Sequence, residues 1–572
     1  MSPTLVIESS SRRSWMPGSI ATLGILAGLS IWLANTSTGN LREQLKWLQP
    51  WSLDACVLVL LVTTIVLINS VDRNSLRREL PRLLMLSILG VALTVFAAPR
   101  TNRIFYDEQI YQGIGQNIAD VRLAQMCNDG NVEYGRLRCV SGEYNKQPYA
   151  YPHALSLAYR LLGVHTWTAF AVNAAAMAMT ICAVYLLVCV AFRDREAALF
   201  AGLLITLMPE QLLWSATAAV EPTASLAVIV AVLCAAHFAR SGSAPALLAV
   251  VVMAAYAVQF RPESILVLPV IAVIVWPRVR PELGHLRGSW AACLFLCLIG
   301  VHVAHLFAIR HIDWGTTGPR FSLRYIQANL PVNGRFYLYD ERFPVAFTVL
   351  AVAGLISARH RREALSMAMY FLLFFVIGLV FYAGSYNYGA DVRYSLMTYP
   401  PLAVLGGLGA ARIAQLGTRL ASPFGSGFVT VRLVRAVFLA ILVFQFLWYA
   451  PVVRATTEEA WAARADVRFA QAFASEIPPN SYVLTHNPGM FHVWGVSAGQ
   501  MYLVTSNPAY LQFLAQRYRG GLYLHWNFWC NTQDQRQQEI CRQSFGIVPV
   551  DVAKEYRERD QHFGFYHMKV VN

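Results

Sequence analysis

Long apolar runs recur along the whole chain, each close to the roughly 20 residues that cross a bilayer as a helix. They lack the strict alternation of polar and apolar positions that is typical of a membrane β-barrel. Helices satisfy their own backbone groups in lipid, so the pattern predicts an all-α polytopic membrane protein. We expect thirteen spans, at residues 17–35, 53–70, 83–98, 166–192, 197–213, 222–239, 246–260, 264–277, 289–308, 344–357, 364–384, 396–412 and 435–450.

The spans and the segments between them divide the chain into four parts. Residues 1–98 hold the first three spans, 99–165 form an external loop, 166–450 hold the other spans, and 451–572 form a tail. The tail contains the helix-like "TEEAWAARADVRFAQAFASEI", the turn "PPN" and the strand-like "SYVLTH". It is long enough for a small α/β domain outside the membrane. The first span could be mistaken for a signal peptide, but no small-x-small cleavage site follows it, so we expect a retained helix.

Composition supports the membrane assignment, and charge predicts the orientation. The chain is 56% hydrophobic and 14% charged, with a net charge of +14, whereas soluble domains carry about 25% charged residues. Most of the basic excess lies in the segments between spans that the topology places inside the cell. It is therefore explained by membrane orientation, and the sequence predicts no nucleic-acid partner. The positive-inside rule then places the N-terminus in the cytoplasm and the loop and tail outside, which is the periplasm for a bacterial inner membrane. The basic residues of these inner segments include Arg73, Arg77, Arg78, Arg82, Arg278, Arg280, Arg359, Arg361 and Arg362.

The ten cysteines fall into two groups. Six lie in apolar segments and are expected to be inert packing residues. The other four lie in the predicted external regions as two local pairs, Cys127 with Cys139 and Cys530 with Cys541. Because an oxidising exterior permits disulfides, we predict two disulfides, with four free thiols as the alternative. No Cys/His spacing resembles a zinc site.

An acidic pair opens the external loop, in "RIFYDEQIYQGIGQNIAD". After Asp107 the apolar residues recur at the spacing of one helix face, which predicts an amphipathic helix along the membrane surface. Glu108 points about 100° away from Asp107 on such a helix. The simplest role for Asp107 is an N-cap, since Asp caps helices well and acids suit the first turn.

Further charged residues lie at the predicted external ends of spans, where burying charge is costly. A single such residue is usually a snorkelling side chain or one half of a structural ion pair. Several at one membrane face, all beside the Asp107 loop, predict a shared polar cavity. They are Lys146, Glu221, Arg261, Glu263, Arg393 and, beside the last, Tyr394.

This set of residues suits a reaction with an activated, lipid-linked sugar. Nucleotide sugars are absent outside the cell, but a sugar on a polyprenyl phosphate carries a stable phosphate leaving group. Arg or Lys can bind that phosphate, and one carboxylate can act as the general base for an acceptor hydroxyl. A glycosidase would instead need two positioned carboxyl groups.

Four segments resemble one family in order and topology. The Asp-Glu pair before "IYQGIGQNIA" is followed by "YNKQPYAYPHALSLAYRLLGV", "SATAAVEPTASLAVIVAVL" and "VRYSLMTYPPLAVLGGLGAARI". Together they resemble the GT-C fold integral-membrane glycosyltransferases of the family 39 type, which include protein O-mannosyltransferases and lipid A aminoarabinose transferases. The resemblance covers residues 100–412 approximately. It departs from the family at Gln147-Pro148-Tyr149, where the family has Pro-Pro, and in the two additional spans before the loop.

The resemblance implies an inverting transferase that uses a polyprenyl-phosphate monosaccharide. Asp107 matches the family's catalytic carboxylate, and Glu108 would support it or help bind a metal ion. We assign the donor phosphate to Lys146, Arg261 and Arg393 as candidates, with Glu221 orienting the site and Tyr394 beside it. A divalent cation, the sugar and the acceptor (protein, lipid or glycan) stay open.

Three other functions are compatible with such a fold. A transporter or flippase of lipid-linked sugars would show mid-membrane charge and repeat symmetry, neither of which the sequence displays. A non-catalytic scaffold would have lost Asp107 or the cationic residues. Transfer of a whole lipid-linked oligosaccharide is the enzymatic alternative.

Overall fold

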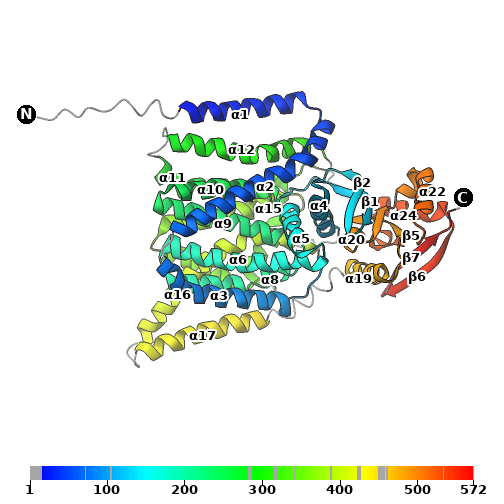
Figure 1. Ribbon diagram of the computed structural model, residues 1–572. Coiled ribbons are helices and arrows are strands. Elements are labelled where there is room, and N and C mark those ends of the chain that lie inside the picture. The colour runs from blue at the N-terminus through cyan, green and yellow to red at the C-terminus, as the bar shows by residue number, and fades with distance from the viewer. Residues whose placement is uncertain are drawn as a thin grey trace, which may run out of the picture.

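The computed structural model describes most of the chain, and the described part is an elongated molecule (Figure 1). Helices make up one end and the middle, and the strands lie at the other end. The structure describes residues 16–70, 73–103, 106–280, 286–312, 318–340, 342–386, 389–421, 427–448, 458, 461–532 and 534–570.

The helical part consists of long, roughly parallel helices that share one apolar core (Figure 1). Two shorter helices, α4 and α5, lie between this bundle and the strands. The elements are α1 (Met16–Asn35), α2 (Thr38–Ser70), α3 (Arg73–Ala92), η2 (Leu93–Ala97), α4 (Asp107–Val121), α5 (Ala150–Leu162), α6 (Thr166–Phe192), α7 (Arg195–Thr206), α8 (Pro209–Ser215), α9 (Glu221–Ser241), α10 (Ala244–Ala257), η3 (Pro262–Leu266), α11 (Val267–Val279), α12 (Leu286–Ala308), η5 (Leu323–Tyr325), α13 (Ile326–Tyr339), α14 (Val345–Ser357), α15 (Arg361–Val380), η6 (Gly389–Thr398), α16 (Tyr399–Ala421) and α17 (Gly427–Trp448).

Apolar helices long enough to span a membrane are fewer than the thirteen expected. Within the described residues eight helices meet that length and composition, or nine if α7 and α8, which meet at 61°, form one broken span. Three more apolar segments are shorter, at Ala244–Ala257, Val345–Ser357 and Arg435–Leu447. The expected number is therefore not confirmed. Length explains part of the difference, because α10 and α14, with 14 and 13 residues, fall below the roughly 20 residues of a full crossing.

The tail folds as the expected small α/β unit, but its sheet has an unexpected second source. Strands β1 (Met126–Glu133) and β2 (Arg136–Glu143) come from the predicted external loop and extend a sheet built by the tail. The strand order is β2-β1-β4-β3-β5-β7-β6, with β4, β3 and β5 parallel at the centre. The tail elements are α19 (Trp461–Glu476), β3 (Ser481–Thr485), α20 (Pro488–Val493), β4 (Ser497–Gln500), α21 (Leu503–Ser506), α22 (Pro508–Arg517), β5 (Gly521–Trp526), α23 (Phe528–Asn531), α24 (Gln535–Ile547), β6 (Val550–Glu558) and β7 (Gln561–Met568).

Both local cysteine pairs of the loop and the tail form disulfides. Cys127 and Cys139 join β1 to β2, and Cys530 and Cys541 join α23 to α24. Each bond closes a short loop, of 12 and 11 residues. Closing such loops lowers the entropy of the unfolded chain and so favours the folded hairpin and helix pair.

The helix after Asp107 forms as predicted, but its polar face is not open to water. Gln109, Gln112 and Gln116 are buried, because α20 of the tail packs on this face of α4. The two helices approach so closely that a Cβ atom at Gly113 would lie 3.3 Å from the Cα atom of Gly489. The side-chain amide of Gln116 donates to the carbonyl of His492, at 3.2 Å. The tail therefore holds the helix that begins at Asp107.

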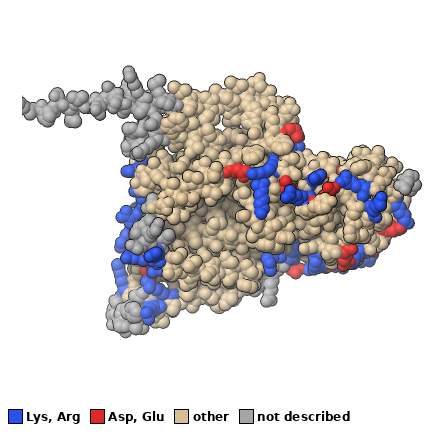
Figure 2. Space-filling view, in the orientation of Figure 1, with Lys and Arg blue, Asp and Glu red and all other residues tan. Residues whose placement is uncertain are grey.

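Charged side chains are distributed unevenly over the surface (Figure 2). Lys and Arg gather along the edge of the helical part farthest from the strands, whereas the strand end carries both signs. Arg240, Arg278 and Arg362, at ends of α9, α11 and α15, line one pocket of this region. The distribution follows the pattern from which the sequence predicts a cytoplasmic face, and the orientation itself stays a prediction.

Candidate functional site

Asp107 is the first residue of α4, and the residue before it, Tyr106, caps the helix. Tyr106 has φ of 90° and donates its backbone N–H to the side-chain oxygen of Gln109, at 2.9 Å. A positive φ is costly for a tyrosine and persists only where surrounding contacts impose it. Asp107 is therefore not used as the N-cap, the simplest role that its sequence context offered.

The charged residues predicted at the external ends of spans do come together in the structure. Arg393 of η6 lies 3.9 Å from a carboxylate oxygen of Asp107 and 3.2 Å from one of Glu221. Arg261 forms ion pairs with both Glu221 and Glu263. We call these five residues, Asp107, Glu221, Arg261, Glu263 and Arg393, the charged cluster.

Local backbone structure places the members of the cluster. Glu221 is the first residue of α9, where the helix dipole favours a negative charge. Arg261 precedes Pro262 and is extended, with φ of −146°, as a residue before proline should be. Both side chains are largely buried, with 3% of Glu221 and 12% of Arg261 exposed. Buried charges of this kind must be paired, and here each is.

Two other predicted residues belong to the same neighbourhood. The guanidinium groups of Arg261 and Arg393 each lie 5.1 Å from the centre of the Tyr394 ring, within the range of a cation–π contact. Lys146 is close enough to Asp107 to act on its pKa electrostatically. Tyr394 therefore holds the two arginines side by side, and Lys146 adds a third positive charge.

Burial raises the pKa of the Asp107 carboxyl above its ordinary value. Arg393 opposes this rise in pKa, the like charge of Glu221 adds to it, and Arg261 and Lys146 oppose it more weakly. Although 34% of the Asp107 side-chain surface is exposed, the loss of hydration raises its pKa more than the nearby cations lower it. A carboxylate with a raised pKa is a better proton acceptor than an ordinary aspartate, and its exposed side admits a second molecule.

Glu108 is used differently from its neighbour. It is fully buried, and its two carboxylate oxygens accept hydrogen bonds from the backbone N–H groups of Arg103, at 2.8 Å, and Ala218, at 2.9 Å. These bonds tie the start of α4 to the chain before it and to the segment between α8 and α9. Glu108 thus supports the position of Asp107.

We expect Glu108→Gln to lower the stability of the protein more than its rate. Glutamine keeps one acceptor oxygen, so one buried N–H loses its partner, at a cost of about 1–3 kcal/mol. Thermal unfolding of the purified variant, compared with the exposed control Glu555→Gln, measures the effect. A rate loss beyond a hundredfold at unchanged stability would instead place Glu108 in the chemistry.

A second buried ion pair anchors the chain just before Asp107, and the sequence analysis missed it. Arg103 lies 3.2 Å from Glu210 of α8 and 4.2 Å from the centre of the Trp214 ring. Trp214 donates its indole N–H to the same carboxylate, at 3.0 Å. The available signal was an acid, Glu210, inside the apolar segment "LMPEQLLW". Such an acid requires a buried partner, but the sequence does not say which one.

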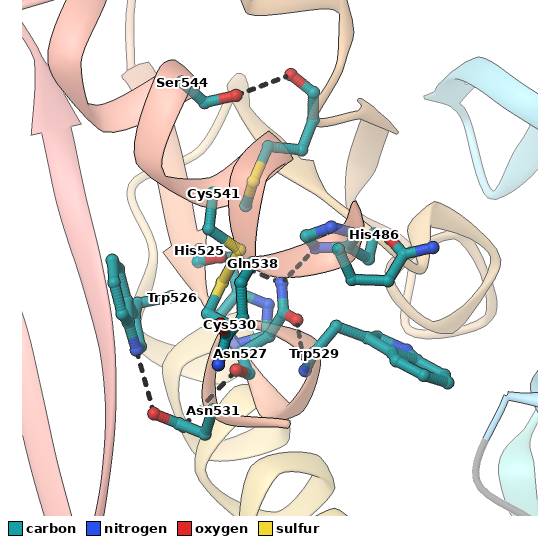
Figure 3. Close-up of a disulfide and its surroundings, with 12 residues drawn as sticks. His486, His525, Trp526, Asn527, Trp529, Cys530, Asn531, Gln538, Cys541 and Ser544 are labelled. Atoms are coloured by element: carbon teal, nitrogen blue, oxygen red, sulfur yellow. Dashed lines mark hydrogen bonds between the residues drawn. A yellow bond between two sulfur atoms is a disulfide. The ribbon is translucent and has the colours of Figure 1, made fainter. Parts of the chain in front are cut away.

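One group of side chains in the described part of the chain has the spacing of metal ligands. It consists of His486, Cys530 and Cys541, but the two cysteines are bonded to each other (Figure 3). A disulfide offers no thiolate to a metal ion. In the charged cluster the carboxylates pair with arginines, and the question of a divalent cation, which the sequence left open, stays open.

Comparison with known proteins gives one family match. The family described as dolichyl-phosphate-mannose-protein mannosyltransferase matches residues 146–306. This segment contains Lys146, Glu221 and Arg261 but neither Asp107 nor Arg393. No curated protein matches the chain at a significant level.

Solved structures resemble the chain over most of its length. ArnT from Cupriavidus metallidurans in the apo state superimposes with a TM-score of 0.54 and 14% identity, over 86% of this chain and 98% of ArnT. ArnT bound to undecaprenyl phosphate superimposes with a TM-score of 0.51 and 13% identity, over 85% of this chain and 97% of ArnT. The archaeal oligosaccharyltransferase AglB from Archaeoglobus fulgidus superimposes with a TM-score of 0.48 and 12% identity, over 86% of this chain and 74% of AglB. The chain therefore has the GT-C fold of integral-membrane glycosyltransferases, the fold that the sequence resemblance implied.

Proposed function

We propose that the protein is a membrane glycosyltransferase that moves a monosaccharide from a polyprenyl-phosphate donor to an acceptor hydroxyl group. The observation that carries the proposal is the contact between Asp107, a carboxylate with a raised pKa, and Arg393 of the charged cluster. A base and a phosphate-binding cation side by side are what this reaction requires. The fold shared with ArnT, which has been solved with undecaprenyl phosphate bound, supports the same donor class.

In this mechanism Asp107 is the general base. Its carboxylate accepts the proton of the acceptor O–H as that oxygen attacks C1 of the sugar. The bond between C1 and the phosphate oxygen breaks at the same time, so the anomeric configuration inverts. Polyprenyl phosphate leaves as a stable anion, and no general acid is needed.

The cations of the cluster bind the donor phosphate. Arg393 and Arg261 both pair with Glu221, which fixes their guanidinium groups before the donor arrives. A preorganised guanidinium binds phosphate in a bidentate manner with little loss of side-chain entropy. Lys146 adds a point charge beside Asp107. Glu221 is thus a positioning residue that holds two arginines in reach of one phosphate.

The reaction would take place on the external side of a bacterial inner membrane. The predicted orientation places α4, the charged cluster and the tail in the periplasm, where lipid-linked sugars replace nucleotide sugars as donors. The acceptor is a glycan, lipid or protein hydroxyl at that surface.

The experiment that tests this function is sugar transfer by the purified protein in lipid. It is offered a panel of labelled polyprenyl-phosphate monosaccharides together with total envelope material. We expect a labelled product from one donor and release of one polyprenyl phosphate for each sugar transferred. Labelled product from a lipid-linked oligosaccharide alone would favour the oligosaccharide alternative. No product from any donor by folded protein would overturn the proposal, and translocation of lipid-linked sugars would be measured next.

A further inference from the structure

A pocket of about 320 Å³ lies at the carboxyl ends of the central strands of the sheet. His486 directly follows β3, Gln500 ends β4, and Tyr502 lies two residues further, and all three line it. β3 and β4 are parallel. In α/β sheets ligands bind in the crevice outside the carboxyl ends of parallel strands. We call this space the strand-end pocket.

The remaining walls come from two distant parts of the chain. Tyr106 and Glu143, the last residue of β2, belong to the external loop, and Arg536 belongs to α24 of the tail. The pocket is therefore complete only when loop and tail are joined in one sheet. Its volume lies at the lower end of the ~300–1,000 Å³ range of small-molecule sites.

Tyr106 connects the pocket to the charged cluster. Its hydroxyl donates to the backbone carbonyl of His486, at 2.6 Å, and its ring meets the Trp529 ring edge to face, with centroids 5.4 Å apart. Trp529 and His486 lie beside the Cys530–Cys541 disulfide, as Figure 3 shows. Asp107 is the next residue in the chain. The pocket wall at Tyr106 and the proposed base are thus neighbours in the chain.

The lining chemistry suits a sugar better than an anion or an apolar chain. Tyr502 is 42% exposed and offers a ring face, while Glu143 and Arg536 offer one charge of each sign. Met126 and Ile540 add apolar lining that suits the carbon faces of a sugar, whereas a phosphate site would have an excess of cations and a lipid chain would need walls without charged side chains. Asn128, Gln500 and Gln537 also line the pocket and offer side-chain amide donors and acceptors. Amide groups of this kind favour a ligand that can hydrogen-bond.

We propose that the strand-end pocket binds a sugar unit of the acceptor, so that the acceptor is a glycan or a glycolipid head group. The proposal rests on the proposed function and names its acceptor class. The tail then selects the acceptor, while the helical part and the charged cluster bind the donor.

Two variants test the pocket, Tyr502→Ala and Arg536→Ala, each in the full-length protein in nanodiscs. The matched controls are Phe513→Ala, an aromatic that is 51% exposed in the same domain, and Arg542→Ala on α24. The probes are methyl glycosides of common hexoses and pentoses, followed by saturation-transfer NMR without any donor present. We expect at least one glycoside to bind the wild type, and at least fivefold weaker binding to both variants but not to the controls.

A kinetic measurement tests the same pocket during transfer. With the donor and envelope acceptor found by the transfer assay, both variants should raise the KM for the acceptor about tenfold and leave the KM for the donor unchanged. A raised donor KM, binding of inorganic phosphate or a Ser/Thr-rich peptide in place of glycosides, or no glycoside binding would overturn the proposal. Glycoside binding by a protein that transfers no sugar would leave the pocket standing and overturn the proposed function alone.

Discussion

Asp107→Asn should lower the rate of sugar transfer at least a hundredfold while the protein stays folded. Asparagine has nearly the same shape as aspartate but cannot accept a proton, and positioned general bases typically contribute about 10²–10⁴-fold. The Asp107 side chain is 34% exposed and pairs with Arg393 at 3.9 Å, beyond a short hydrogen bond. Its removal should therefore cost little stability. Single-turnover rates with saturating donor measure the effect on the chemical step.

The matched control is Asp551→Asn, which removes an exposed carboxylate of the tail that pairs with Lys569 at the surface. This variant should transfer sugar at the wild-type rate. If Asp107→Asn retains more than about a tenth of wild-type activity, Asp107 is not the base, and Glu221 becomes the next candidate. Partial recovery in Asp107→Glu would support proton transfer, because glutamate restores the carboxylate at a changed distance.

Arg393→Gln should lower kcat/KM for the donor about tenfold to a hundredfold and also shift the pH dependence. Loss of one charge-assisted hydrogen bond to phosphate costs about 1.5–3 kcal/mol, and each 1.36 kcal/mol is a factor of ten. Arg393→Lys should recover part of the loss, because a point charge replaces the bidentate guanidinium. Donor KM and kcat, measured separately, show whether the arginine acts on binding or on the chemical step.

The direction of the pH shift follows from the pKa of Asp107. Burial raises this pKa, so the active carboxylate is lost as pH falls through a value above that of an ordinary aspartate. Arg393 lowers the pKa, so Arg393→Gln should move the acid limb of the rate profile to higher pH. Glu221 raises the pKa, so Glu221→Gln should move the limb to lower pH. An acid limb at the same pH in the wild type, Arg393→Gln and Glu221→Gln would show that Asp107 does not control the pH dependence of the rate.

The control for the arginine is Arg342→Gln, since Arg342 also pairs with a carboxylate, that of Asp340 at 2.9 Å, but outside the charged cluster. Its acid limb should match that of the wild type. A similar shift in this variant would mean that the effect reflects general loss of positive charge.

The helical architecture could be predicted because hydrophobicity is a local property. Each apolar run overlaps one or two helical elements, and the α4 helix begins at Asp107 as its apolar spacing indicated. The number of helices that fully cross the membrane could not be predicted. The run 197–213 is apolar throughout, and its hydrophobicity gives no sign of the 61° bend between α7 and α8. The joint sheet was missed because the pairing of β1 with β4 depends on contacts between segments far apart in sequence.

The cluster of charges could be predicted from position, but the partners could not. Glu221, Arg261 and Arg393 are charged residues with apolar neighbours at the ends of predicted spans. Burying such charges is costly, so the sequence alone marks them as paired or functional. That both arginines pair with Glu221 depends on the packing of three separate elements. The part played by Tyr106 was invisible, because its anchor is the backbone carbonyl of His486, and a backbone group carries no sequence signal.

The shared sheet sets an order on biogenesis. The hairpin of β1 and β2 is synthesised early, yet Ser497, whose hydroxyl accepts a hydrogen bond from the backbone N–H of Val132 in β1, lies 365 positions later in the chain. At a synthesis rate of about 5–20 residues per second, the edge of β1 that pairs with β4 stays unpaired for some tens of seconds. Open edges recruit foreign strands. A nascent chain arrested before the tail would thus keep this edge unpaired and be open to pairing with other chains.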